Sequence, residues 1–455
     1  MTRLISLACL AVAHWIGGVV GAVELVQSAD GNDILCAPVA CDAMASLIPE
    51  LPRWSPHEII VKFHDAVGQE MRDQLVRQHG CSVSCTSEPG NFHLLRIPES
   101  GMPDDLVASF LEHGEVDYAE LNHYVRVFLT PDDPYFRYQW NLDNRVTGGI
   151  QMEAAWGIET GDPNVIVAVV DTGVAYEDYG VYRRAPDLAE TPFVQGYDFI
   201  NDDNHPNDDH GHGTHVTGTI AQSTNNRIGV AGVAFGCSVM PVKVLDVNGL
   251  GDTFTLAQGI YYAVNHGARV INLSLGDDSP STTLKNALAF AYQHGVTVVC
   301  AAGNDYLKGN PVEYPGAYND YCLAVGATRY DNTRAPYSST GSYVDIAAPG
   351  GDMLVDQNGD GYPDGIVQQT FVLDPTALAY YFFQGTSMAA PHVSGLAAPL
   401  ISHGVRGPDE VRQAIEATAI DLGPAGWDPE YGWGLIDAGA ALTYQVSADA
   451  NGSAL

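Results

Sequence analysis

Basic side chains are scarce in this sequence. Lysine and arginine together number 20 against 55 aspartates and glutamates, which leaves a formal net charge of −35 over 455 residues. Because proteins hold nucleic-acid phosphates through basic surfaces, this balance argues against a nucleic-acid partner. We expect most of the acids to solvate the surface, and the composition leaves salt tolerance and calcium binding open as alternatives.

Long apolar runs are equally rare, and only residues 1–22 contain one. Arg3 precedes an apolar stretch over 4–20, and Val20-Gly21-Ala22 offers small residues at a cleavage site, which is typical of a secretory signal. A histidine and two glycines interrupt the stretch, which favours a cleaved signal over an anchor helix. Elsewhere no segment reaches the ~18 apolar residues that a membrane span needs. The expected mature protein is secreted, extracellular or periplasmic, without a membrane partner.

Cysteine is uncommon too, and none of the eight cysteines has the CxxC spacing of a zinc site. An exported chain can form disulfides, and Cys36–Cys41 and Cys81–Cys85 are candidate close pairs. The three cysteines after residue 200 leave at least one unpaired in their region. Connectivity does not follow from spacing, so both pairs stay open.

Glycine, by contrast, is abundant, with 48 residues in a chain that is 46% hydrophobic. This predicts a compact, turn-rich protein, and the length fits two or three domains. Residues 23–55 lack periodicity and are expected to be a linker, whereas 56–128 predict a small α+β, ferredoxin-like unit of two helices and four short strands. Its clearest segments are strands 58–63, 92–97 and 116–120 and helices 68–79 and 104–113.

Apolar strands alternate with helices through 129–445, ahead of a short tail over 446–455. Continuous valine and isoleucine runs between helices predict a parallel sheet covered on both faces. Ligand sites in such folds lie at the carboxyl ends of the strands. The expected strands are 165–170, 238–244, 270–275, 297–301 and 323–327, and the expected helices are 214–221, 253–266, 282–294 and 389–402.

One serine lies where an aromatic strand turns into an alanine-rich helix. The segment is Gly385-Thr386-Ser387-Met388-Ala389-Ala390-Pro391-His392, after the aromatic run 380–383. A helix N-terminus presents free N–H groups, so a serine there can attack a carbonyl while those groups stabilise the oxyanion. Ser387 is therefore a candidate nucleophile that needs a base and an orienting acid.

Three further polar residues follow apolar strands or precede a helix. Asp171 closes 165–170 and Asn304 follows 298–303, although either residue type is also common in a turn. His212 stands in a glycine-rich segment just before a helix. The alternative there is a metal cluster, and its candidate ligands are His205, His210, His212, His215, Asp208 and Asp209.

The order Asp171, His212, Ser387, with His-Gly-Thr-His over 212–215 and the octapeptide from Gly385, resembles the subtilisin-like serine proteases, or subtilases. The resemblance implies a three-layer parallel-sheet domain and a serine endopeptidase that cleaves proteins or peptides. It makes Asp171, His212 and Ser387 a triad and Asn304 an oxyanion donor, with no cofactor for the chemistry. We expect a monomer.

The unit over 56–128, directly before the catalytic segment, resembles a subtilase propeptide. The resemblance implies a self-processing zymogen whose own propeptide acts as chaperone and inhibitor; an unrelated small domain is the alternative. The resemblance also implies substrate-binding segments, with Glu313 near the base of the S1 pocket and a tolerance for Arg or Lys at P1. Those segments contain Gly249, Gly251, Ser274, Leu275, Gly276, Ala302 and Gly303.

Calcium is expected at two places, as structural Ca²⁺ held by oxygen ligands. By resemblance the first set is Asp133, Asp187, Asn226, Ile228 and Val230. The second is Asp356, Asn358, Asp360 and Asp364, which have EF-hand spacing with Gly361 at position 6. Position 12 is Val367 instead of glutamate, so a full EF-hand is excluded. An Asn-rich turn and a turn-forming insertion are the respective alternatives.

Two rival functions remain compatible with these motifs. A catalytically silent subtilase fold would bind peptides or calcium, and a metal-binding protein would use the histidine and aspartate cluster. The presence of all four residue types of the catalytic set argues against both.

Overall fold

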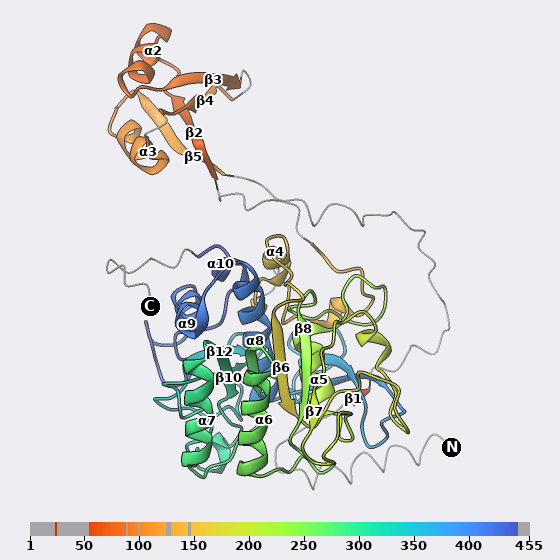
Figure 1. Ribbon diagram of the computed structural model, residues 1–455. Coiled ribbons are helices and arrows are strands. Elements are labelled where there is room, and N and C mark those ends of the chain that lie inside the picture. The colour runs from red at the N-terminus through yellow and green to blue at the C-terminus, as the bar shows by residue number, and fades with distance from the viewer. Residues whose placement is uncertain are drawn as a thin grey trace. The chain divides into compact units, whose positions relative to one another are not determined.

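The computed structural model of the protein describes residues 23–24, 54–87, 90–98, 101–123, 129–143 and 147–444. The chain divides into two compact units, Asp30–Val127 and the remainder, Met1–Ala29 with Phe128–Leu455. Each unit is described by itself (Figure 1). The expected signal over 1–22 and the expected tail over 446–455 lie outside the described residues.

The smaller unit is a four-stranded antiparallel sheet with two helices. Strand order β3-β4-β2-β5 with a helix after β2 and after β4 is the ferredoxin-like arrangement, so the expected fold of this unit is confirmed. Ile59, Val61 and Phe63 alternate toward a buried core that also contains Leu95 and Phe110. The elements are β2 (Trp54–Phe63), α2 (Gln69–Gln78), β3 (Ser82–Ser87), β4 (Phe92–Arg96), α3 (Pro103–Leu111) and β5 (Val116–His123).

The candidate pair Cys81–Cys85, which the sequence left open, does not form a disulfide. Cys81 is buried and Cys85 is exposed, and both are free thiols, as are the three later cysteines. Two strands overlap the ends of the expected linker over 23–55. Val23–Glu24 form a short strand, β1, that belongs to the larger unit, and Trp54 already begins β2.

The larger unit is built on a seven-stranded parallel sheet, as predicted. Its strand order is β12-β11-β10-β9-β6-β8-β7, and every pairing is parallel. The strands are β6 (Ile166–Asp171), β7 (Tyr197–Asp198), β8 (Ser238–Lys243), β9 (Ala268–Leu273), β10 (Thr297–Ala301), β11 (Leu323–Thr328) and β12 (Ile346–Pro349).

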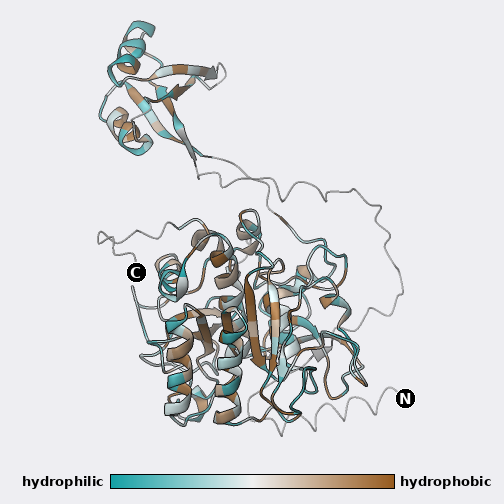
Figure 2. Cartoon of the chain, in the orientation of Figure 1, coloured by the Kyte–Doolittle hydropathy of each residue, from teal (hydrophilic) through white to brown (hydrophobic). Residues whose placement is uncertain are grey.

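Helices cover both faces of this sheet because alternate strand residues point to opposite sides. Val167 and Val169 pack into one core with α5 (His212–Ala221) and α8 (Thr386–Ser402). Ala168 and Val170 pack into the other core with α6 (Thr253–Asn265) and α7 (Thr282–Gln293), which lie side by side in Figure 1. Figure 2 shows the apolar strands between these helices. The three-layer fold is confirmed.

The aromatic strand was predicted from the sequence, whereas its partner strands and three of the shorter helices were not located. The aromatic run is strand β14 (Ala379–Phe383), which pairs antiparallel with β13 (Ile366–Thr370) and with β1 in a separate sheet. The remaining helices are α4 (Met152–Trp156), α9 (Gly407–Ala417) and α10 (Ala438–Ala441), with short 3-10 turns at Phe136–Tyr138, Pro186–Leu188 and Tyr306–Lys308.

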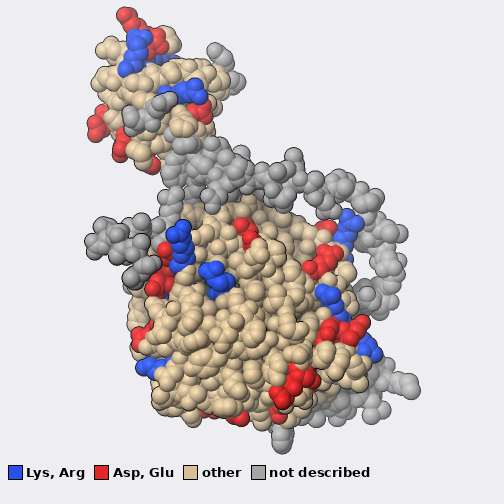
Figure 3. Space-filling view, viewed as in Figure 1, with Lys and Arg blue, Asp and Glu red and all other residues tan. Residues whose placement is uncertain are grey.

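Most of the visible surface is uncharged. Figure 3 shows separate acidic and basic groups on the face that it presents, with neither kind gathered into one continuous patch. Among the described helices, none is both long and apolar enough to cross a membrane.

Candidate active site

The candidate residues gather at the carboxyl edge of the parallel sheet. Strand β6 lies between β8 and β9, so the connections on its two sides run in opposite directions and open a crevice at its carboxyl end. Register places Val169 of β6 beside Asn272 of β9, and Asn272 beside Val299 of β10. Two residues further on are Asp171 and Ala301, which end β6 and β10, and Ser274, which directly follows β9.

The aspartate and the histidine form a close pair. Asp171 is the last residue of β6 and is fully buried, and its Oδ1 lies 2.8 Å from Nδ1 of His212, the first residue of α5. Burial lowers the pKa of His212, but the charge of Asp171 and this hydrogen bond outweigh burial and raise the pKa above its ordinary value. Nδ1 of His212 is therefore occupied by its hydrogen bond to Asp171, which leaves Nε2 to bond another group.

A buried aspartate holds the loop that leads into His212. Oδ1 of Asp208 accepts hydrogen bonds from the backbone N–H groups of His210 and Gly211 and from the Thr172 hydroxyl, at 2.9 to 3.0 Å. Its Oδ2 accepts from the backbone and the hydroxyl of Thr214, at 2.9 and 2.6 Å. Asp208 thus joins the residue after Asp171 to the first turn of α5.

A buried lysine also contacts the loop before α5 and the residue that follows Asp171. Lys243, at the end of β8, is fully buried and donates to Asp209 Oδ1 at 2.6 Å, to the Thr172 carbonyl at 2.6 Å and to the Leu245 carbonyl at 2.9 Å. Neither Lys243 nor the role of Asp208 was predicted from the sequence. In the sequence, Lys243 is visible as a single charged residue in an apolar strand, and Asp208 as an acid just before the start of a helix.

Ser387 lies in the first turn of α8, one turn earlier than the helix was expected to begin. Every residue of α8 except Ser387 and Ser402 is buried. At the N-terminal end of the helix, Ser387 is therefore the accessible side chain. The hydroxyl donates to the Ser274 carbonyl at 3.1 Å. Within the described part of the chain, no hydrogen bond joins it to His212.

A chain of buried hydrogen bonds anchors the serine to the sheet. Ser394 donates to Asn272 Oδ1 at 2.8 Å, Asn272 donates to the Ser274 hydroxyl at 2.9 Å, and that hydroxyl donates to the Ser387 carbonyl at 2.9 Å. Because three of these four residues are buried, the chain locks the start of α8 to the end of β9.

Asn304 and the serine backbone supply two N–H donors to one space. Oδ1 of Asn304 accepts from the backbone and the hydroxyl of Thr386, at 2.9 and 3.0 Å, so the amide nitrogen faces away from that contact. Gly385 has φ +148°, and a Cβ on it would lie 3.6 Å from the Ser387 nitrogen and 3.8 Å from the Asn304 Nδ2. The two donors therefore border a space that glycine keeps open.

The substrate-binding candidates flank this space. Ser274, Leu275 and Gly276 follow β9, and Ala302 and Gly303 follow β10, so the segments leave neighbouring strands at the same edge. The loop with Gly249 and Gly251 follows β8, and a Cβ on Gly249 would lie 3.2 Å from His210 Nε2. The structure therefore brings all seven residues to the edge where Asp171, His212 and Ser387 lie.

The alternative metal cluster at the histidines is not formed. No group of three or more His, Cys, Asp or Glu side chains among the described residues is arranged to hold a metal ion. His215 is fully buried, with Nε2 3.0 Å from the Ile366 carbonyl and its ring stacked on Phe383. His205 pairs with Glu177 at 2.8 Å. These histidines have separate structural partners.

The first calcium set comes together from three segments. Asp133 and Asp187 are buried, and burial raises their pKa values to about 6 and about 7. Asn226 donates to Asp187 Oδ1 at 2.9 Å, and the Val230 N–H donates to Oδ2 at 3.0 Å. The groups that contact Asp187 here are N–H donors, so the two buried carboxylates are what favours a hard cation, which would supply the missing positive charge.

The second calcium set forms a single loop between β12 and β13. Asp356, Asn358 and Asp360 accept hydrogen bonds from the loop's own backbone, at 2.7 to 3.1 Å. Asp364 is 1% exposed and its Oδ1 has no partner. Burial, together with the charges of Asp356 and Asp360, raises the pKa of Asp364 to about 6. The three carboxylates of this loop are not arranged around a common metal position, so the unpaired buried oxygen of Asp364 is the observation that favours a cation here.

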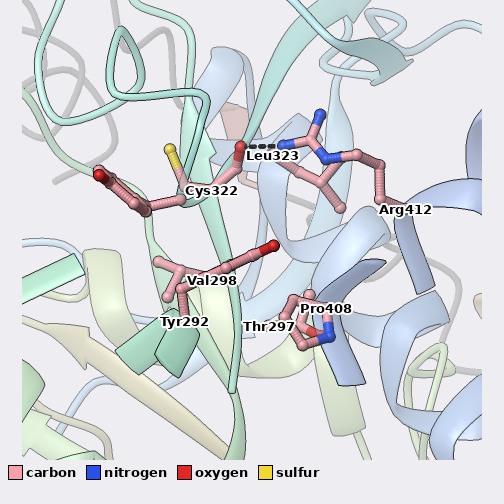
Figure 4. A pocket seen from close by; sticks show the side chains of 8 residues that line it. Tyr292, Thr297, Val298, Cys322, Leu323, Pro408 and Arg412 are labelled. Atoms are coloured by element: carbon pink, nitrogen blue, oxygen red, sulfur yellow. Dashed lines mark hydrogen bonds between the residues drawn. The ribbon is translucent and has the colours of Figure 1, made fainter. Parts of the chain in front are cut away.

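A small hollow in the larger unit lies at the other end of the sheet. Figure 4 shows Thr297, Val298 and Leu323 at the amino ends of β10 and β11, with Arg412 reaching across to donate to the Cys322 carbonyl. Because Asp171 and Ser387 lie at the carboxyl edge, this hollow is not part of the candidate active site.

Sequence comparison matches both units to known families. The profile described as "Subtilase family" matches residues 162–434, and the profile described as "Fervidolysin N-terminal prodomain" matches residues 52–122. A thermophilic serine proteinase of Bacillus sp. (strain AK1) is 36% identical over 394 residues, which cover 85% of this chain and 87% of that protein. Thermitase of Thermoactinomyces vulgaris is 37% identical, covering 69% of this chain and 100% of thermitase.

Solved structures agree. A protease from Pseudoalteromonas arctica superposes with a TM-score of 0.60 at 35% identity, covering 69% of this chain and 99% of that one. Fervidolysin from Fervidobacterium pennivorans, described as a keratinolytic enzyme related to subtilisin, has a TM-score of 0.55 at 27% identity, covering 87% and 62%. Fold, profiles and relatives define the class, a serine endopeptidase made with a prodomain. The chain belongs to the subtilase family.

Proposed function

We propose that the protein is a secreted endopeptidase that hydrolyses peptide bonds through Asp171, His212 and Ser387. The observation that carries the proposal is the 2.8 Å contact between Asp171 and His212 at the same sheet edge as Ser387. Two observations support it further. Ser387 is the one accessible residue at the start of a buried helix, and two N–H donors border the space beside it.

The reaction begins when the Ser387 hydroxyl turns from the Ser274 carbonyl toward Nε2 of His212. His212 takes the hydroxyl proton as the oxygen attacks the substrate carbonyl, and it then returns that proton to the leaving amine. Asp171 keeps the Nδ1–H tautomer and stabilises the imidazolium, as the raised pKa of His212 implies. Water then hydrolyses the acyl-enzyme through the same groups.

The oxyanion of each tetrahedral intermediate lies between two fixed donors. The Ser387 N–H points from the start of α8, and the Asn304 amide is oriented by its bonds to Thr386. Because both donors are positioned before substrate arrives, they stabilise developing charge without reorganisation. The Asp208 and Lys243 contacts position His212 and Asp171 and do not touch the substrate.

The substrate is an extended peptide, and the prodomain is the enzyme's own inhibitor until export. Backbone edges after β9 and β8 would pair with the peptide main chain, which makes binding largely independent of sequence. The extracellular relatives, among them a minor extracellular protease of Bacillus subtilis at 35% identity, support secretion. A mature N-terminus outside residues 124–135 in protein recovered from the medium would contradict the proposed maturation.

Calcium would serve stability at the two carboxylate sites. At the first, Asp133, Asp187, Asn226 and the carbonyls of Ile228 and Val230 would hold the ion; the Asn226 amide must turn to offer its oxygen, because that oxygen now accepts from the Ile228 N–H. At the second, Asp356, Asn358, Asp360 and Asp364 would hold it. A melting temperature unmoved by EGTA counts against both sites.

The decisive experiment is active-site labelling. We expect a serine-directed phosphonyl fluoride to label processed protein stoichiometrically, and the Ser387→Ala variant to take up no label. The matched control is Ser402→Ala, because Ser402 is the other accessible residue of α8 and lies at its far end. Processed, folded protein that stays unlabelled would identify a silent subtilase fold instead.

A further inference from the structure

The strand that leads into the nucleophile has an outer edge that the start of the chain covers. β14 pairs with β13 on one side and with β1 on the other. The pairing with β1 is antiparallel and sets Val23 beside Phe382 and Glu24 beside Tyr381. In the part of the chain that the structure describes, no other strand lies along that edge. Without β1, the backbone N–H and C=O groups of the edge would lack strand partners.

Side-chain packing holds β14 in place. Phe382 is 1% exposed and packs with Val230 and Val367, and Phe383 is buried in the main core of the larger unit. The Phe383 ring also stacks on His215, with ring centroids 4.4 Å apart. The edge of β14 therefore already has the conformation that an added strand needs, so pairing requires little ordering of β14 itself.

The same strand is connected to the proposed catalytic residues. β14 ends at Phe383, and α8, which carries Ser387, begins at Thr386. His215, on which Phe383 stacks, lies in the first turn of α5 together with His212. A segment that pairs with β14 is therefore attached to the strand that runs into the nucleophile.

The order of the chain separates β1 from the unit that it joins. By its contacts β1 belongs to the larger unit, although the smaller unit, Asp30–Val127, lies between the two in sequence. The expected signal ends at Ala22, so β1 would be the first two residues of the exported precursor. A maturation cut within residues 124–135 would leave β1 and the prodomain on the same excised fragment, because both precede the cut.

We propose that β1 is a second attachment point of this excised fragment and that its strand addition to β14 slows the release of the prodomain. The inference rests on the proposed function, in which the prodomain inhibits the enzyme. Because the prodomain and β1 are parts of one polypeptide, two linked contacts must both be lost before the fragment leaves. Only Val23 and Glu24 pair with β14, so the added retention is modest. Once the fragment has left, the edge of β14 is open.

Disulfide trapping tests the pairing in the full precursor. The Ser387→Ala variant should stay uncleaved, and Glu24→Cys with Tyr381→Cys places two cysteines at directly opposed positions. We expect mild oxidation to join them, as read by peptide mass mapping, because opposed Cβ atoms on antiparallel strands lie about 4.5–5.5 Å apart. The matched control is Glu24→Cys with Tyr179→Cys, since Tyr179 is an exposed tyrosine in the loop after β6. A yield no higher than that of the control overturns the pairing.

Release of the fragment tests the regulatory role. Glu24→Pro removes a backbone donor and disfavours the strand, whereas Glu24→Gln keeps the backbone donor and is the matched control. After processing, phosphonyl fluoride blocks Ser387 and stops digestion, and gel filtration then measures how long the fragment stays with the catalytic unit. We expect the half-life of this association to be about three- to tenfold shorter in Glu24→Pro than in Glu24→Gln.

The labelling yield separates this inference from the proposed function. Equal half-lives in the two variants, with Ser387 labelled, overturn the regulatory role of β1 alone. Processed protein that stays unlabelled overturns the proposed function and the regulatory role with it. The disulfide yield does not depend on activity and decides by itself whether β1 pairs with β14. If Glu24→Pro is not exported, Glu24→Gly takes its place, because glycine also weakens a strand.

Discussion

Asp208→Asn is the substitution that most directly tests how the histidine is positioned. The change keeps size and shape but replaces Oδ2 with an N–H₂ group. That oxygen now accepts two hydrogen bonds from Thr214, at 2.9 and 2.6 Å, in a side chain that is 1% exposed. The new amide would direct its hydrogens at the Thr214 N–H, while Oδ1 would keep its three bonds to the preceding loop and Thr172.

The expected loss of stability follows from the two hydrogen bonds between Asp208 Oδ2 and Thr214. A hydrogen bond to a charged group contributes about 1.5–3 kcal/mol, and an unsatisfied buried N–H costs about 1–3 kcal/mol. The Thr214 hydroxyl can turn to accept from the new amide, which replaces part of the loss. We expect the free energy of unfolding to fall by about 2–4 kcal/mol and the melting temperature by roughly 4–12 °C. Displacement of the His212 ring should reduce kcat about 10- to 100-fold.

Calorimetry of the Ser387→Ala background measures the melting temperature without self-digestion, and peptide hydrolysis in the active background measures kcat. Asp202→Asn is the control, since its exposed side chain should change stability by no more than about 0.5 kcal/mol. If Asp208→Asn melts within about 1 °C of that control and keeps its kcat, Asp208 does not organise the start of α5 and the reasoning is wrong.

Three further measurements test the site. Gly385→Ala should lower kcat/KM at least about tenfold, because the added carbon enters the space between the two N–H donors; an unchanged kcat/KM would place the oxyanion elsewhere. The acid limb of kcat/KM for a substrate with an uncharged P1 residue should have its midpoint above about 6.5, since His212 must lose a proton from a raised pKa; a midpoint at or below 6.5 would contradict the Asp171 contact. In EGTA the folded protein holds protons on Asp133 and Asp187 up to their pKa values of about 6 and about 7. In the unfolded chain the same carboxyl groups lose their protons near pH 4. Stability without calcium should therefore fall as the pH rises toward 8, and the gain in melting temperature on adding calcium should be larger at pH 8 than at pH 5; equal gains would exclude these two carboxylates as ligands.

The sequence predicted the parallel sheet well because each strand carries a continuous apolar run. Strand β10 was predicted with its observed bounds, and β6, β8 and β11 within one residue. Strand β3 was not located, because five of its six residues are exposed and show no alternation. The start of α8 was placed three residues late, since nothing local indicates that Thr386 already has helical geometry.

Residue types and local context marked Asp171, His212, Ser387 and Asn304 as candidates, and the resemblance to the subtilases gave them their roles, without any structure. Apolar periodicity predicts which elements form, and a polar residue at a strand end or helix start is visible in one dimension. Contacts between segments are not. Asp208 joins Thr172 to Thr214, Lys243 reaches Asp209 from another strand, and Glu313 fills a slot between Gly276 and Gly303. Each of these arrangements depends on segments that are distant in sequence and neighbours in space, so only the folded chain brings the groups within reach of one another.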